Sequence, residues 1–76
     1  MYVLNQYGNI LVNMDSIKQL FYTGNQICAF TDDGVLTLGK YKDEGEAEKA
    51  YKLILVRMRD SDRHGRLIIQ VPLEDL

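Results

Sequence analysis

Residues 17–40 decide the fold, and they read IKQLFYTGNQICAFTDDGVLTLGK. Two tight-turn signals, Gly24-Asn25 and Asp33-Gly34, each lie between short apolar runs. Gly-Asn and Asp-Gly are favoured in two-residue hairpin loops, because those loops require positive φ. The stretch therefore predicts an antiparallel meander of three strands. These strands cover residues 17–23, 26–31 and 35–40.

The two turns also predict the register, in which Ala29 lies between Leu20 and Leu38 on neighbouring strands. Because side chains alternate along a strand, the register divides the sheet into two faces. Both faces are apolar, although a half-solvated antiparallel sheet should be apolar on one side only. One face carries Leu20, Tyr22, Ile27, Ala29, Leu36 and Leu38, and the other carries Ile17, Phe21, Cys28, Phe30 and Val35.

An amphipathic helix is predicted after the meander, from about residue 44 to residue 59. Asp43 is a suitable N-cap, and Glu46 stands three residues later, as in a capping box. Leu53 and Val56 point away from the apolar stripe of this helix. The stripe has the i, i+3, i+4 spacing of a single helix face and consists of Ala47, Ala50, Tyr51, Ile54, Leu55 and Met58.

Further strands are predicted on both sides of this central part. Residues 2–5 and 10–13 read as a hairpin, residues 61–65 as a polar loop, and residues 66–71 as a final strand that Pro72 ends. The fold class is therefore α+β: an antiparallel meander of about five strands, partly curled, with one amphipathic helix packed on one face and a C-terminal strand. We expect a single domain over residues 1–76, in which the last strand joins the sheet or pairs with another subunit.

A single helix can cover only one face of the sheet. The second face must be covered by the N-terminal hairpin, by the C-terminal strand or by another chain, and the surplus of apolar surface predicts a homo-oligomer. The candidate oligomer interface consists of Phe21, Phe30, Leu53, Val56, Leu67 and Ile69.

Composition limits the chemistry that this chain of 76 residues can perform. With Cys28 as the only cysteine and His64 as the only histidine, we expect no disulfide, no metal site and no cofactor. A formal net charge of −2 gives no electrostatic case for nucleic-acid binding. No apolar run is long enough to span a bilayer and no signal-peptide pattern is present, so a cytoplasmic protein without membrane contact is expected.

A cluster of basic residues is the best polar candidate for a binding site. Asp60 and Asp62 dilute its charge, and residues 60–65 resemble a calcium-binding loop only until its fifth position, which is His64. The cluster could bind phosphate or an acidic partner, or it could merely offset the helix dipole. Its members are Arg57, Arg59, Arg63, His64 and Arg66.

Several short motifs resemble those of small uncharacterised proteins encoded by Firmicutes and their phages. The motifs are LVNMDSI at residues 11–17, ICA at 27–29, LGKY at 38–41 and EA at 46–47. This resemblance implies a phage or mobile-element setting, in which small proteins often bind host factors, including defence proteins. The segment 61–76 departs from the shortest members, which end after the helix.

These observations predict a small non-enzymatic protein-binding module, homo-oligomeric and of phage or mobile-element type, that acts as an inhibitor of a host defence system. The alternative is a small-ligand binder that captures a nucleotide or another phosphate through the cluster at residues 57–66. Neither hypothesis assigns a catalytic residue, because no catalytic motif is present.

Overall fold

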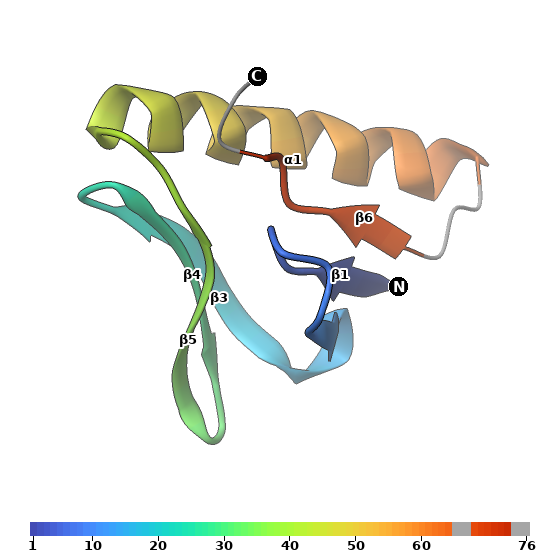
Figure 1. The fold of residues 1–76 in the computed structure, drawn as a ribbon. Coiled ribbons are helices and arrows are strands. Elements are labelled where there is room, and N and C mark those ends of the chain that lie inside the picture. Colours follow the sequence, from blue (N-terminus) through green and yellow to red (C-terminus); the bar gives the residue numbers. More distant parts are fainter. Residues whose placement is uncertain (65–67, 74–76) are drawn as a thin grey trace.

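The computed structural model describes residues 1–64 and 68–73, and the side chains of residues 61–64 lie outside this description. The described part holds two three-stranded sheets and one long helix (Figure 1). The α+β class is confirmed, but the single five-stranded meander is not, because the strands divide between two sheets. The elements in chain order are β1 (Tyr2–Leu4), β2 (Leu11–Asn13), the 3-10 helix η1 (Met14–Ser16), β3 (Ile17–Thr23), β4 (Gln26–Thr31), β5 (Gly34–Lys40), α1 (Glu44–His64) and β6 (Ile68–Gln70).

The first sheet is the predicted meander, in the order β3-β4-β5. The β3–β4 hairpin has the predicted register, with Leu20 opposite Ala29. Its loop places Gly24 at φ +55 and leaves Asn25 at negative φ, which is the pattern of a type II′ turn. A local turn signal was therefore enough to align these two strands.

The predicted register of the β4–β5 hairpin is wrong by two residues. Ala29 pairs with Leu36 rather than with Leu38, because the loop is Asp32-Asp33 and Gly34 pairs with Thr31. A loop at Asp33-Gly34 would have required positive φ at Asp33, whereas only Gly34 has it, at +118. The Thr31 hydroxyl stabilises the observed loop, since it accepts from the Asp33 amide and donates to the Gly34 carbonyl. A shift of two residues leaves the two faces of the sheet unchanged.

Two irregularities bend this sheet. One lies between Ile17 and Gln19, and it turns Ile17 to the face that packs on the core, contrary to the prediction. The other lies between Ile27 and Cys28 on β4, opposite the end of β5. Bulges of this kind increase strand twist, which lets the meander curl around the core.

The second sheet has the order β2-β1-β6. β1 pairs antiparallel with β2, as the predicted hairpin requires, and parallel with β6. The C-terminal strand thus pairs with the N-terminal hairpin rather than with the meander. Val3 lies between Val12 and Ile69 in the register, and this row faces the core.

Helix α1 begins as predicted, because an Asp43 carboxylate oxygen accepts a 2.9 Å hydrogen bond from the Glu46 amide. It ends later than predicted, at His64, so the expected polar loop at residues 61–65 is helical up to His64. No glycine or proline interrupts the chain from Glu46 to His64, and polar residues alone do not stop a helix. Leu55 was assigned to the buried stripe but is 43% exposed.

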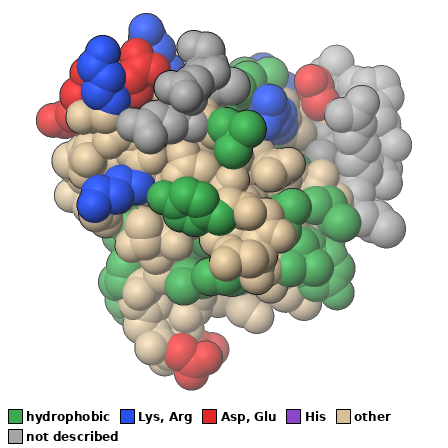
Figure 2. Space-filling model, viewed as in Figure 1, with side chains coloured by type: hydrophobic (Ala, Val, Ile, Leu, Met, Phe, Trp, Pro, Cys, Tyr) green, Lys and Arg blue, Asp and Glu red, His purple; other side chains and the backbone are tan. Residues whose placement is uncertain are grey.

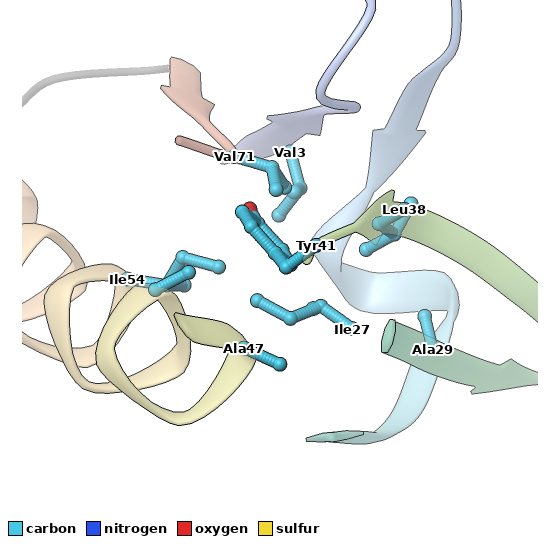
Figure 3. Close-up of a cluster of buried hydrophobic side chains, with 9 residues drawn as sticks. Val3, Ile27, Ala29, Leu38, Tyr41, Ala47, Ile54 and Val71 are labelled. Carbon is cyan, nitrogen blue, oxygen red and sulfur yellow. The ribbon is translucent and has the colours of Figure 1, made fainter. Parts of the chain in front are cut away.

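The core lies between α1 and the inner faces of both sheets (Figure 3). Tyr41 is at its centre, between Ile54 of α1 and the side chains of Val3 and Val71. Its hydroxyl donates a 2.6 Å hydrogen bond to the Pro72 carbonyl. One buried aromatic residue therefore connects the helix, the meander and the C-terminal segment. The other members of the core are Ile27, Ala29, Leu38, Ala47 and Ala50.

Candidate binding surfaces

The face of the β3-β4-β5 sheet that points away from the core carries an apolar group with polar residues at its sides. Phe30 pairs with Val35 and Phe21 pairs with Cys28, so these four side chains lie in two adjacent rows, which Gln19 and Thr37 complete. Phe30 is 41% exposed and Val35 is 60% exposed, whereas Cys28 is buried. We call these four residues the outer sheet face.

The outer sheet face is open because both covering elements lie on the other side. Helix α1 packs on the inner face through Ile54, and the β2-β1-β6 sheet packs there through Val3. The sequence offered the N-terminal hairpin and the C-terminal strand as covers for this second face. Within residues 1–64 and 68–73, both elements contribute instead to the single core.

Two side chains of α1 cap the edges of the two sheets. The Tyr51 hydroxyl donates to the Leu20 carbonyl on β3 at 3.3 Å, and Arg57 Nη1 donates to the Gln70 carbonyl on β6 at 2.9 Å. Leu20 and Ala29 form a non-hydrogen-bonded pair in the β3–β4 ladder, so this carbonyl points away from β4. Capping of exposed edges suppresses unwanted strand pairing, and α1 therefore blocks one edge of each sheet.

The basic cluster is only partly visible in the structure. Arg57 is half-buried and bonded to the Gln70 carbonyl, so its guanidinium has a structural role that the sequence did not reveal. Arg59 is exposed on the following part of the helix. The backbone of Arg63 and His64 is part of α1, but the structure does not describe their side chains. Arg66 lies outside the described residues.

The residues predicted to form an oligomer interface do not gather on one surface. Phe21 and Phe30 share the outer sheet face, whereas Val56 is exposed on the back of α1 and Leu53 is half-buried. Ile69 is only 3% exposed, because its position opposite Val3 in the parallel ladder turns it into the core. It is therefore not available for an interface. Leu67 lies outside the described residues.

Sequence reasoning missed a second apolar surface, on the outside of the β2-β1-β6 sheet. Leu4 pairs with Leu11, and Tyr2 pairs with Ile68, so the register places all four on one face. Leu11 is 52% exposed and Ile68 is 54% exposed. Hydrophobic side chains gather on this part of the molecule, over β1 and β6 (Figure 2). The uninterrupted apolar run at residues 2–4 indicated this surface, because a strand with one solvent-exposed face should alternate apolar and polar residues.

The described residues hold no cluster of metal-ligating side chains. Among residues 1–64 and 68–73, no three His, Cys, Asp or Glu side chains are grouped to hold a metal ion. The described helix is not apolar enough to cross a membrane. The chain matches no protein-family model, no curated protein and no solved structure.

Proposed function

We propose that this protein is a small non-enzymatic protein-binding module that self-associates through the outer sheet face. The observation that carries the proposal is the exposed pair of Phe30 and Val35, with Phe21 and the buried Cys28 in the adjacent row of the same face. Contiguous exposed apolar side chains of this kind usually mark an interaction site. Aromatic residues are also enriched at the centres of protein interfaces.

The outer sheet face is better suited to this role than the other exposed apolar side chains. It lies on strands of six or seven residues, whereas the surface formed by Tyr2, Leu11 and Ile68 lies on strands of three residues. Val56 and Leu55 are exposed on a single helix, which offers a narrower surface than a three-stranded sheet. A wider and stiffer sheet presents a larger preformed surface, and preformed surfaces lose less entropy on binding.

The partner that we favour is a second copy of the same chain. A chain of this size buries a smaller fraction of its surface than a larger domain does, so association adds stability that the monomer core cannot supply. The resemblance to phage-associated proteins adds a host protein as a further class of partner for the same face. An inhibitor of a host defence system would use such a face by covering part of its target.

The experiment is a measurement of molar mass by size-exclusion chromatography with light scattering, at concentrations up to the high micromolar range. We expect the wild-type chain to elute as an oligomer and Phe30→Lys to elute as a monomer, because a buried unpaired ammonium group is costly at an interface. Thermal unfolding of Phe30→Lys at low concentration checks that the variant is folded.

Two control variants distinguish this face from its alternatives. Val56→Lys places the same charge on the back of α1, and Leu11→Lys places it on the outside of the β2-β1-β6 sheet. Both should keep the oligomeric mass. A monomeric wild-type chain, or a Phe30→Lys variant with unchanged mass, would contradict the proposal.

A further inference from the structure

One half of the β5 edge has backbone groups without a partner among residues 1–64 and 68–73. Gly34 pairs with Thr31 beside the Asp32-Asp33 loop, and antiparallel pairs alternate between hydrogen-bonded and non-hydrogen-bonded. The N–H and C=O groups of Val35 and Thr37 therefore point away from β4, outward from the sheet. This free half-edge consists of Val35, Leu36 and Thr37.

The other half of the same edge is already occupied by the chain itself. The Gln6 amide donates to the Leu38 carbonyl at 2.8 Å, and Gln6 Oε1 accepts from the Lys40 amide at 2.8 Å. Gln6 thus bonds to β5 much as a neighbouring strand would, and it is only 2% exposed. The backbone groups of the β5 edge are therefore oriented as strand pairing requires, and Gln6 bonds only to those at the end near Lys40.

A hollow of about 320 Å³ lies beside the free half-edge. Val12 of β2 and Ser16 of η1 form one wall, and the β4–β5 hairpin forms the other. Val12 and Leu36 are partly buried and pack against the core, so the floor of the hollow is apolar. Such a volume lies at the small end of the range for binding pockets, which suits one or two side chains rather than a cofactor.

Within the described part of the chain, a single carboxylate lies at the hollow. Asp33 is the one ionisable side chain among the described residues that line it. Lys18 forms a 2.8 Å ion pair with the neighbouring Asp32, and neither residue lines the hollow. Acidic side chains also mark the tip of the β4–β5 hairpin at the lower end of the molecule (Figure 2).

We propose that the free half-edge of β5 binds an extended basic peptide segment of another protein by strand addition. Backbone hydrogen bonds form with Val35 and Thr37, and one apolar side chain of the peptide lies in the hollow between Val12 and Leu36. A Lys or Arg of the peptide faces Asp33. In strand addition the main chain supplies affinity and the pockets for alternate side chains supply specificity.

The test uses the ¹⁵N-labelled full chain and capped peptides as probes. A peptide of sequence TKTVT, in which Lys and Val lie two positions apart and so share a face, should shift the amide signals of Val35 and Thr37 and slow their hydrogen exchange. The matched peptide TETVT should bind about threefold more weakly, because its carboxylate faces Asp33. A TKTVT peptide with N-methyl groups on the backbone should not bind, because it cannot pair with the edge.

Three variants separate the backbone role from the side-chain roles. Val35→Pro removes the outward-facing N–H, which an edge strand tolerates, together with the isopropyl group, and it should weaken TKTVT binding about tenfold or more. Val35→Thr also changes that side chain but keeps the N–H, and it should weaken binding much less than Val35→Pro does. Asp33→Asn should remove the preference for TKTVT over TETVT.

Several outcomes would overturn the proposal. These are unchanged Val35 and Thr37 signals with both peptides, binding of the N-methylated peptide as tight as that of TKTVT, and binding of TETVT as tight as that of TKTVT. Protection of the two amides without peptide, increasing with protein concentration, would assign the edge to a second copy instead. The N-methylated peptide keeps the test valid if Val35→Pro fails to fold. The titration is repeated with Phe30→Lys, which should not self-associate. A failure of the proposed self-association can then be told apart from a failure of peptide binding at the β5 edge.

Discussion

The two sheets of this small protein are held together in different ways. The β3-β4-β5 sheet joins consecutive strands through two-residue loops, so its pairing is local. The β2-β1-β6 sheet pairs Tyr2 with Ile68, which lie at opposite ends of the chain, and its strands have three residues each. Short strands with distant partners gain little from pairing alone, because loop closure costs entropy.

The second sheet is therefore stabilised by contacts that come from outside it. The Tyr41 hydroxyl bonds to the Pro72 carbonyl, and Arg57 bonds to the Gln70 carbonyl. Gln6 connects the chain after β1 to the end of β5. The local β3-β4-β5 sheet can therefore form from turn chemistry, whereas the non-local β2-β1-β6 sheet depends on the core and on side-chain hydrogen bonds.

The largest effect should come from removing the core residue of β6. Ile69→Ala should lower the free energy of unfolding by about 2–4 kcal/mol, because it leaves a cavity at a position that is 3% exposed. Ile68→Ala, one residue earlier and 54% exposed, is the matched control and should change stability by less than about 0.5 kcal/mol. Urea unfolding of both variants measures the difference. Equal effects would mean that β6 does not face the core as described.

A second, smaller effect is expected at Gly39, where the two sheets meet. A Cβ on Gly39 would lie 2.9 Å from Val71 Cγ1 and 3.1 Å from the Tyr41 hydroxyl oxygen. Gly39→Ala should therefore destabilise the protein by about 1–3 kcal/mol through overpacking.

The cause of the Gly39 effect can be checked with a double mutant. Val71→Ala removes the colliding methyl group, so Gly39→Ala should cost less in that background, by a coupling that a double-mutant cycle measures. Gly45→Ala is the control, because a Cβ there meets only an Asp43 oxygen at 3.4 Å. It should leave stability unchanged or slightly raised, since alanine favours the helix. Additive effects of Gly39→Ala and Val71→Ala would contradict the close approach.

The same comparison explains which parts of the structure the sequence could predict. The bounds of β3 and β4 and the N-cap at Asp43 followed from turn and capping chemistry, which acts over a few residues. The parallel pairing of β1 with β6 could not be predicted, because no local signal identifies a partner more than sixty residues away. The shifted β4–β5 register also escaped prediction, since the Thr31 hydroxyl rather than the Asp-Gly dipeptide determines that loop.

The candidate site was predictable to a similar extent. Phe21 and Phe30 were placed on one open face from alternation alone, and the structure agrees. Arg57 looked like part of a recognition cluster, because its acceptor on Gln70 becomes a neighbour only when β6 folds back along α1. The hollow beside Leu36 was invisible in the sequence, since it depends on how the two sheets diverge.

A third variant tests the hydrogen bond at the centre of the core. Tyr41→Phe should cost about 1–2 kcal/mol, because it removes the donor to the buried Pro72 carbonyl. Tyr51→Phe removes a longer and less buried bond, to the Leu20 carbonyl, and should cost less than about 0.5 kcal/mol. Hydrogen exchange of the Val71 amide, which donates to the Leu4 carbonyl, should accelerate in Tyr41→Phe more than exchange in β4. Similar acceleration in both sheets would show that they unfold as one unit.

The smallest effect, and the sharpest test of the role of the arginines, is expected at Arg57. Arg57→Ala should cost about 0.5–1.5 kcal/mol, because it removes the donor to the Gln70 carbonyl and leaves the edge of β6 uncapped. Arg59→Ala, two residues later and exposed, offers a control with the same loss of charge, and it should not change stability measurably. If the two variants have equal stability, the bond to Gln70 contributes nothing. Arg57 then has no structural role that would argue against phosphate binding by the basic cluster. If only Arg57→Ala is destabilised, and faster hydrogen exchange is confined to β6, then Arg57 stabilises the β2-β1-β6 sheet. The non-local sheet then depends on a side chain at the surface of α1 as well as on the core.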